Sequence, residues 1–579
     1  MTWLDWVIVA VFFFISILLG TVFTRRAGQS LESYFVSNRS LPWWLAGSSI
    51  AATAFSSDTP LLITGMVRQK GIWGTWEVLS LALSTMLSVF VFAKLWKRAN
   101  VLTEVELVER RYSGPPAAVL RGFKAIYWGV LYNCFIIGAW PVTGLRKVLE
   151  ELLHVSRETA IVSCVVLAAL YTSCSGLWGV MLTDFFQFLW AMAGAVLLAW
   201  AAIHALGGIG VLRATLATTP YVHAVPPLPG AGESLIASPF GWFLGLILIQ
   251  WWAWKNADGG GVIVQRLVSC KDERQAMKSV LWFSIAHYCL RAWPWILTAL
   301  ASLILIPNES VLIQQGGRWI VDHERAYPLL ITQLLPAGLR GVMVASFFAA
   351  FLSTVSTQLN WGASYVVNDW YKRFINRTAE DRHYVWVSRL VPFGLAAGSM
   401  GVAFAMTSVG QAFTLILNLT AGIGPVLLLR WGWWRVNAWS EIAALVASPV
   451  ILAIRPQALA WLGWPSGSLT ELAWMVLGTA LVWIPVTLLT PPVDRAVLKR
   501  FYADVRPPGA WKPVALVTAT QDVWLMSVFQ WAVGSLAIVL SALGPLEWLL
   551  HNRWTGAAWC GLAAAAWVVL AYTIVQEGR

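Results

Sequence analysis

Charged residues are scarce in this chain. Only 12% of its 579 residues are charged and 58% are hydrophobic, whereas a water-soluble domain carries about 25% charged residues. Apolar runs of the length that crosses a bilayer recur, for example at 7–23, 82–96, 188–206 and 235–254. The ten-residue alternation of an outer-membrane barrel is absent. The sequence therefore predicts an all-α polytopic membrane protein.

Cysteine is also scarce, and the common catalytic signatures are missing. The six cysteines are scattered, without the spacing of a metal site or a disulfide framework, so we expect them to be small core residues. No G-x-S-x-G, H-E-x-x-H or P-loop sequence occurs. We therefore expect a protein that is not an enzyme and that uses no organic cofactor.

Positive charge is distributed unevenly between the connections. The net charge is +12, and basic residues gather in alternate loops, at 25–39, 94–124, 266–278, 372–382 and 495–506. This is the positive-inside pattern of membrane proteins, and it argues against nucleic acid as a partner. Asp5 precedes the first apolar run, Arg25 and Arg26 follow it, and no small-residue cleavage site closes it. We expect an uncleaved first helix with the N-terminus outside and the C-terminus in the cytoplasm.

Apolar segments and their breakers predict about fifteen helices. The expected spans are 3–24, 43–68, 72–98, 121–149, 157–175, 177–206, 237–256, 278–306, 327–368 (with a possible break near Pro336), 386–407, 410–433, 437–455, 470–490, 521–543 and 555–575. The longest outward connections are expected at 207–234 and 307–326. The charged segment 101–121 is expected to lie on the cytoplasmic membrane surface as an amphipathic stretch.

Two of these segments contain interruptions. The stretch 46–65 carries seven hydroxyl or acidic residues and then Pro60, which removes an amide donor. The stretch 250–266 holds three consecutive glycines with Lys255, Asn256 and Asp258. Irregular backbone at membrane depth is tolerated only where it lines a cavity or is buried in protein. Paired breaks five helices apart point to an inverted-repeat transporter, although two ordinary kinks or a misassigned loop would give the same pattern.

Hydroxyl groups are concentrated in the stretch "FLSTVSTQLN", residues 351–360. In a helix, Ser353, Thr354, Ser356 and Thr357 share an arc of about 160°. Such hydroxyls often bond back to their own helix or bridge neighbouring helices. Four oxygens on one arc are better explained by a small hard cation such as sodium. Asp184 is a candidate ligand for a second cation, with a salt bridge or a water contact as the alternative.

At these residues the chain resembles the sodium/solute symporter family, which has the leucine-transporter-type fold, and within it a poorly characterised bacterial branch. The resemblance covers nearly the whole chain and rests on "LPWWLAGSSIAATAFSSDTP", "GLWGVMLTDFFQF", "VIVQRLVSCKDERQA", "GVMVASFFAAFLSTVSTQLNWGASYVVNDWYKRF" and "GIGPVLLLRWGWWRVNAWSEI". It implies a leading helix and loop in 1–40, two inverted five-helix repeats in 41–206 and 237–434, an extracytoplasmic loop in 207–236, and about four accessory helices in 435–579.

The resemblance also implies ligands for sodium. The first site is implied to use the carbonyl oxygens of Ala52, Phe55 and Ala350 and the hydroxyls of Ser353 and Thr354. A second site, present in some members, is implied to use Asp184, Ser353, Ser356 and Thr357. The whole second set is present, which gives the hypothesis of two sodium ions, although the Asp184 position recurs in members thought to use one.

The identity of the solute cannot be taken from the family resemblance. Sugar-transporting members have an Asn-Gln pair where this chain has Gly260 and Gly261, and a Gln where it has Thr59. The expected pocket residues are Ser56, Thr59, Trp76, Glu77, Trp251, Trp254 and Asp258. Tryptophan faces suit a sugar ring or an ammonium group, so a sugar, an amino acid or a related solute stays open.

The sequence therefore predicts a sodium-coupled symporter that imports a small polar organic solute by alternating access. We expect it in the lipid of a bacterial inner membrane, and no obligate protein partner is indicated. The alternative is a transporter-like sensor or scaffold subunit that carries no flux.

Overall fold

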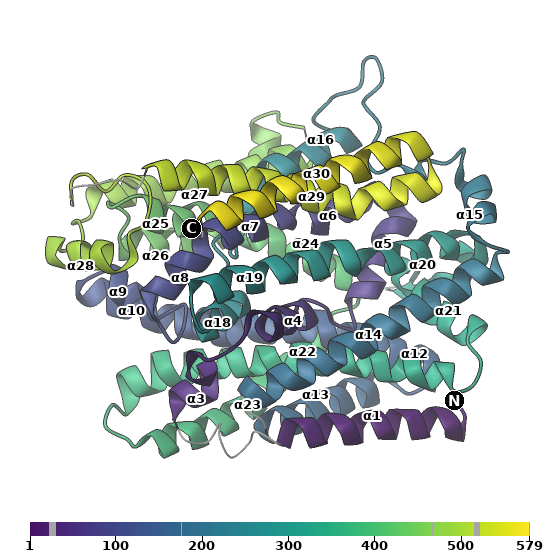
Figure 1. Ribbon diagram of the computed structural model, residues 1–579, viewed down its shortest axis with the longest axis horizontal. Helices are drawn as coiled ribbons and strands as arrows, with labels where there is room; N and C mark the ends of the chain where they lie inside the picture. The colour runs from purple at the N-terminus through teal and green to yellow at the C-terminus, as the bar shows by residue number, and fades with distance from the viewer. Residues whose placement is uncertain (22–29, 175–176, 316, 466, 515–520, 578–579) are drawn as a thin grey trace.

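A computed structural model describes residues 1–21, 30–174, 177–315, 317–465, 467–514 and 521–577. Most helices run along the long axis of the molecule, with the N-terminus at one end of that axis (Figure 1). Within the described residues, ten helices are long and apolar enough to cross a membrane, or eleven if one bent pair is counted as a single span. Each of the predicted helical segments contains helix, so the all-α polytopic fold is confirmed.

The leading part of the chain is anchored by one buried acid. It comprises α1 (Trp3–Thr21) and the short α3 (Leu31–Val36). Asp5 of α1 is fully buried and accepts backbone N–H groups from Gly338 and Gly341 at 2.7 and 2.8 Å. These groups belong to the first turn of a long helix, α22, whose free N–H groups need acceptors. The expected cytoplasmic charges Arg25 and Arg26 lie outside the described residues.

The first half of the core begins with a broken helix. Its elements are α4 (Trp43–Thr53), α5 (Thr59–Lys70), the continuous helix Ile72–Ala99 with α6 (Trp76–Leu79), α7 (Leu81–Leu87) and α8 (Ala93–Ala99), the short α9 (Leu107–Arg111), the continuous helix Gly114–Leu153 with α10 (Gly114–Ile126), α11 (Asn133–Ile137) and α12 (Thr143–Leu153), then α13 (Arg157–Cys174) and α14 (Leu177–Ala205). The predicted break lies at 54–58, and Pro60 follows as the second residue of α5.

The second half repeats the order of a broken helix followed by continuous ones. After α15 (Ile209–Leu216) it contains α16 (Pro239–Gly245), α17 (Trp251–Ala253), α18 (Gly261–Ser269), the continuous helix Glu273–Leu305 with α19 (Glu273–Ser284) and α20 (Ala292–Leu305), the hairpin of β1 (Leu312–Gln315) and β2 (Arg318–Val321), α21 (Ala326–Leu334), α22 (Leu339–Ser364, continuing to Ile375), α23 (Asp381–Ala405), α24 (Val409–Thr420) and α25 (Gly424–Gly432).

The second predicted break lies at the glycine run. Gly259, Gly260 and Gly261 have φ values of 104°, 47° and 49°, a region that favours glycine because it lacks a Cβ atom. The possible break near Pro336 is also present, between α21 and α22. A further bend of 44° between α24 and α25 was not predicted.

After α25 the described residues form α26 (Ala438–Trp461), α27 (Ser468–Leu489), α28 (Arg495–Val505), α29 (Gln521–Leu550) and α30 (Arg553–Glu577). Helices α29 and α30 lie side by side at one edge of the molecule, and α1 lies at the opposite edge (Figure 1). Helices α3, α9 and α28 lie at one end of the long axis, and α20 and α21, which flank the β1–β2 hairpin in the sequence, extend to the other end (Figure 1). The β1–β2 hairpin lies at this second end, which we call the hairpin end.

The segment 101–121 differs from its expected place on a membrane surface. Leu107 and Val108 are buried in the core. Arg111 is also buried and donates to the carbonyl oxygens of Arg430 and Trp433 at 3.0 and 3.1 Å. The charges of this segment serve internal contacts, which an amphipathic pattern alone does not distinguish from solvent contacts.

Candidate functional site

The break in the first core helix meets the hydroxyl-rich part of α22. The hydroxyl of Thr354 donates toward the carbonyl oxygens of Thr53 and Phe55, at 3.0 and 2.9 Å. Both carbonyls lie where the helix is interrupted, so they lack regular helical partners. Two residues of the predicted first sodium site, Phe55 and Thr354, are therefore brought into contact.

The other predicted first-site residues lie around this contact. Ala52 and Ala350 are buried, and the Ala52 carbonyl oxygen accepts the Phe55 N–H at 3.3 Å. Ser353 is one residue before Thr354, and its hydroxyl donates to Asp184 on α14 at 2.7 Å. The two predicted ion sites thus share Ser353, at the junction of α4, α14 and α22.

Asp184 is the centre of a fully buried polar cluster. Its second carboxylate oxygen accepts a hydrogen bond from Ser49 at 2.5 Å, and the guanidinium of Arg266 lies 3.8 Å from it. Arg266 also donates to the hydroxyl of Thr357 at 2.6 Å. Ser356 bonds back to the Ser353 carbonyl oxygen at 3.3 Å. The predicted second-site set is gathered here, together with a cation that the sequence analysis did not include.

Sequence analysis also did not assign a second buried arginine, Arg291, to the site. Arg291 has no exposed surface and donates to the carbonyl oxygens of Ala51, in the last turn of α4, and Ala54, at the start of the first break. Its guanidinium lies over the Phe55 ring at 4.6 Å, and it bonds to His287 at 2.6 Å. The available signal was a basic residue inside an otherwise apolar span. Arg291 supplies a fixed positive charge to carbonyl groups that the break leaves open.

A cavity of about 230 Å³ lies beside both breaks. Three of the predicted pocket residues, Ser56, Thr59 and Trp254, line it. Lys255, named above in the second break, and Asp58, the acid of the first break, line it as well. The remaining walls come from α4, α5 and α18 beside the breaks, from the helices Ile72–Ala99, Gly114–Leu153 and Glu273–Leu305, and from α22 and α24.

The predicted pocket residues Trp76, Glu77 and Trp251 do not line this cavity. The Trp76 indole donates to the carbonyl oxygen of Ala224 at 2.8 Å, and Trp251 packs against Trp531 with ring centroids 5.2 Å apart. These contacts turn both side chains toward neighbouring segments. Glu77 lies nearer the hairpin end, where its carboxylate pairs with Lys70 at 3.1 Å.

Asp258, which was expected in the pocket, also lies outside the cavity lining. Its carboxylate accepts hydrogen bonds from Arg430 at 2.6 Å and from the Trp431 indole at 2.8 Å. The turn of the break carries it toward α25, away from the solute cavity. Sequence spacing could not show this because residues 254–260 are not helical, so helical periodicity does not give the direction of the Asp258 side chain.

Buried polar atoms without partners surround the cavity. Within the described part of the chain, the following atoms of lining residues have no hydrogen-bond partner: Ser56 Oγ, Asp58 Oδ1, Trp140 Nε1, Asn256 Oδ1, Gln358 Oε1 and Trp361 Nε1. Buried polar atoms are normally satisfied, so both donors and acceptors are available to a bound molecule. The cavity has the chemistry of a site for a small polar solute.

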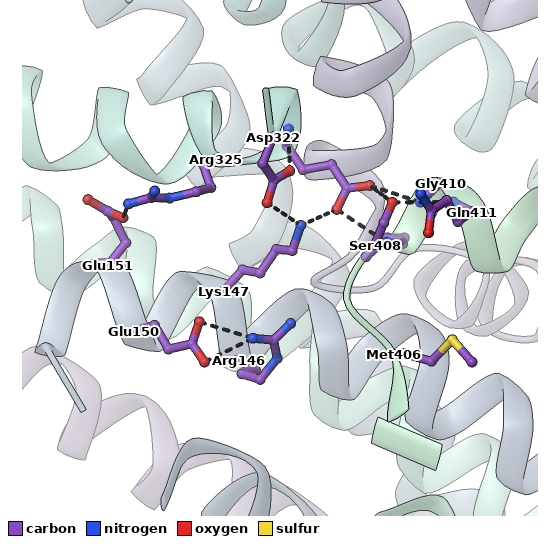
Figure 2. A network of polar contacts seen from close by, with 12 residues as sticks. Arg146, Lys147, Glu150, Glu151, Asp322, Arg325, Met406, Ser408, Gly410 and Gln411 are labelled. Carbon is purple, nitrogen blue, oxygen red and sulfur yellow. Dashed lines mark hydrogen bonds and ion pairs between the residues drawn. The ribbon is translucent and has the colours of Figure 1, made fainter. Parts of the chain in front are cut away.

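A second cavity of about 480 Å³ lies at the hairpin end. Leu62 lines both cavities. Beside it, Lys147 pairs with Asp322 at 2.7 Å and with Glu324 at 2.6 Å (Figure 2). Glu324 also accepts the Gly410 N–H at 2.9 Å. Burial opposes the ionisation of Glu324, but Lys147 and the N–H groups of α24 outweigh it and lower its pKa. This network joins three separate chain segments at the hairpin end: α12, the turn before α21, and the start of α24.

Two interrupted helices that meet beside a polar cavity define the class of inverted-repeat secondary transporters. A sequence model of the sodium:solute symporter family matches residues 34–447. The chain belongs to this family. It is a polytopic membrane protein whose activity is sodium-coupled symport of a small polar solute.

Known relatives agree with this assignment. The chain is 24% identical to a sodium/glucose cotransporter of Vibrio parahaemolyticus over 444 residues, which are 72% of this chain and 78% of that protein. It is 25% identical to the sodium/myo-inositol cotransporter of Mus musculus, over 89% of this chain and 76% of that one. The structure of a substrate-bound, outward-open Na⁺-coupled sialic acid symporter is similar with a TM-score of 0.68 at 20% identity, covering 85% of this chain and 99% of that one.

Proposed function

We propose that the cavity beside the two breaks binds the imported solute. We further propose that the adjacent oxygen set of Ala52, Phe55, Ala350, Ser353 and Thr354 binds the sodium ion that drives its import. The observation that carries this proposal is the meeting of the Thr354 hydroxyl with the Phe55 carbonyl oxygen at 2.9 Å. Unwound carbonyls and nearby hydroxyls are the ligands by which such transporters hold sodium.

The ion would couple the two repeats, 41–206 and 237–434. Sodium would replace the hydrogen bond of Thr354 as the link between α22 and the first break, with the hydroxyl turned so that its lone pair faces the ion. This link would favour one orientation of the repeats until solute binds beside it. Each sodium ion contributes about 2.3 kcal/mol per 100 mV of membrane potential, in addition to its concentration gradient.

A second sodium ion is a separate proposal. It would use Asp184, Ser353, Ser356 and Thr357, and it would share Asp184 with Arg266, which lies 3.8 Å away. Arg266 also holds the Thr357 hydroxyl at 2.6 Å. For an ion to bind, the Arg266 guanidinium must move away from Asp184 or Thr357. Binding at the second site therefore costs free energy that binding at the first site does not.

Location and orientation complete the proposal. The alternation of basic loops favours a bacterial inner membrane with residues 207–236 outside and 491–512 in the cytoplasm. In this orientation the hairpin-end cavity opens outward and leads toward the solute cavity. Residues 435–579 would supply accessory helices around the two repeats.

The deciding experiment measures thermal unfolding of the purified protein in sodium and in choline, followed by solute uptake into proteoliposomes under a sodium gradient. Stabilisation by sodium together with sodium-driven uptake supports the proposal. A protein that sodium stabilises but that moves none of the sugars, amino acids or carboxylates tested would instead favour the alternative of a sensor or scaffold subunit.

A further inference from the structure

Lys255 is a buried cation without a hydrogen-bonding partner. It lies in the break between α17 and α18 and has 2% of its surface exposed. Its ammonium lies over the rings of Trp128, Tyr132 and Trp361, at 4.5, 5.0 and 5.1 Å from their centroids. Among the described residues its ammonium makes no hydrogen bond or ion pair, and Glu104 and Asp258 act on it only through longer-range attraction. Aromatic faces attract a cation, but they leave its three N–H donors unsatisfied.

The acids nearest to this position are already engaged. Glu104 accepts the Gly261 N–H at 2.6 Å and the Tyr365 hydroxyl at 3.1 Å. Arg430 lies 3.8 Å from Glu104 and 2.6 Å from Asp258. These contacts stabilise both carboxylates without a direct bond from Lys255. The ammonium is therefore left facing the solute cavity, which Lys255 lines.

Lys255 is the only lysine or arginine among the described residues that line this cavity. A single ammonium matches one negative charge. Apart from Asp58, an acid in the other break, the lining around it consists of neutral groups that can serve the rest of a solute. Those groups include Asn256 Oδ1, Gln358 Oε1 and Trp361 Nε1, which have no partner in the described chain. A phosphate ester carries about two negative charges at neutral pH, which this lining does not balance.

We propose that Lys255 binds the carboxylate of the solute, so that the transported molecule is a small organic monocarboxylate. This inference rests on the proposed function, in which the cavity is the solute site. The carboxylate supplies the acceptors that the ammonium lacks, in a charge-assisted contact of the stronger kind. Import with sodium is also favoured, because the proposed first sodium site consists of uncharged oxygens and the solute's negative charge offsets that of the ion.

The first test compares matched ligands on the unaltered protein. Thermal unfolding is measured in sodium and in choline with lactate against lactamide, gluconate against glucose, proline against prolinamide, and glucose 6-phosphate as the phosphate arm. We expect at least one carboxylate to raise the unfolding temperature in sodium while its neutral or amide partner does not. Equal stabilisation by both members of every active pair, stabilisation by glucose 6-phosphate alone, or no effect of any carboxylate overturns the inference.

The second test changes the cation. Lys255→Met retains the length of the side chain and removes its charge, so the affinity for the stabilising carboxylate should fall at least about 10-fold, while Lys255→Arg should retain part of it. Lys278→Met, at an exposed position of α19, is the control and should change neither response. Affinity is measured by tryptophan fluorescence, since Trp254 and Trp361 line the cavity. Unchanged carboxylate affinity in Lys255→Met overturns the inference.

The effect of sodium on thermal unfolding, measured without any solute, distinguishes a failure of this inference from a failure of the proposed function. If sodium stabilises the protein but carboxylates do not, the sodium site stands and the role of Lys255 fails. If sodium has no effect, the proposed coupling fails, and the carboxylate comparison in choline still decides the role of Lys255. If Lys255→Met loses its sodium response through misfolding, the matched ligands on the unaltered protein give the answer.

Discussion

The hydroxyl of Thr354 on α22 lies 2.9 Å from the carbonyl oxygen of Phe55, across the break between α4 and α5. This contact joins residues 299 positions apart in the sequence. It connects the first helix of one proposed repeat to a helix of the other. A cation bound at this point would strengthen a link that already exists, so binding and repeat orientation are coupled.

Replacing Thr354 tests the first sodium site. Thr354→Val removes the hydroxyl and preserves the shape of the side chain. At sodium about a hundredfold above its Kd, binding adds about 2.7 kcal/mol of stability, and we expect this increment to disappear. The measurement is the unfolding temperature in sodium against choline.

Thr172→Val is the matched control for that experiment. Thr172 is buried on α13, and its hydroxyl bonds back to the Ala168 carbonyl oxygen at 2.7 Å. Its loss should cost about 1 kcal/mol in both salts alike. A sodium response in Thr354→Val equal to that of the unaltered protein would remove Thr354 from the ion site.

The polar pattern of the sequence predicted the two breaks and the helices that carry them. Proline and glycine act through local backbone geometry, so 54–58 and 259–261 were visible without tertiary information. The hydroxyls of α22 were likewise visible as one arc. The positions of the helices followed from apolar length. The bend between α24 and α25 was missed, although Pro425 lies in the first turn of α25 as Pro60 does in α5.

The partners of buried charges could not be predicted in the same way. Asp258 and Lys255 lie three residues apart, yet one pairs with Arg430 and the other faces the cavity. Arg266 looks like a residue of a basic loop, and Arg291 is a basic residue inside an apolar span, but the sequence shows the partners of neither: Asp184 for the first and the open carbonyls for the second. Each of these contacts depends on helices distant in the sequence, so composition and spacing leave it undetermined.

Ser356 offers the sharper test of a second sodium ion. Its hydroxyl bonds only weakly back to its own helix, at 3.3 Å, so Ser356→Ala removes one proposed ligand and leaves the Asp184–Arg266 pair in place. If two ions drive transport, the sodium Hill coefficient of uptake should fall toward one. Asp184→Asn should have the same effect together with lower stability, because it leaves Arg266 without its carboxylate. A sigmoidal sodium dependence that survives both changes would exclude the second site.

Glu324 is expected to stabilise the hairpin end in its ionised form. Glu324→Gln keeps the size of the side chain but removes the ion pair with Lys147 and weakens the cap on α24, at a cost of about 1–3 kcal/mol. The lowered pKa of Glu324 means that its contribution is present above the unfolded pKa and is lost as pH falls through the folded pKa. Thermal unfolding at neutral and acidic pH should therefore show a smaller acid-induced loss in the variant.

Glu151→Gln is the control for the hairpin-end network. Glu151 pairs with Arg325 at 2.8 Å, and that arginine is 31% exposed. Ion pairs that are more exposed contribute less than about 1 kcal/mol to the free energy of unfolding. The unfolding temperature of Glu151→Gln at neutral pH should therefore remain close to that of the unaltered protein. Equal losses of stability in Glu151→Gln and Glu324→Gln would contradict a special role for the buried pair.

Single cysteines on the two ends of the bundle test the proposed orientation. Ala231 lies exposed in the connection before α16, and Lys499 lies exposed on α28. With the N-terminus outside, an impermeant maleimide applied to intact bacterial cells should label Ala231→Cys and should reach Lys499→Cys only after the membrane is permeabilised. The unaltered chain gives the background, since its five described free cysteines are buried or partly buried. Labelling of Lys499→Cys in intact cells would reverse the orientation, and the hairpin-end cavity would then open to the cytoplasm instead of to the solute supply.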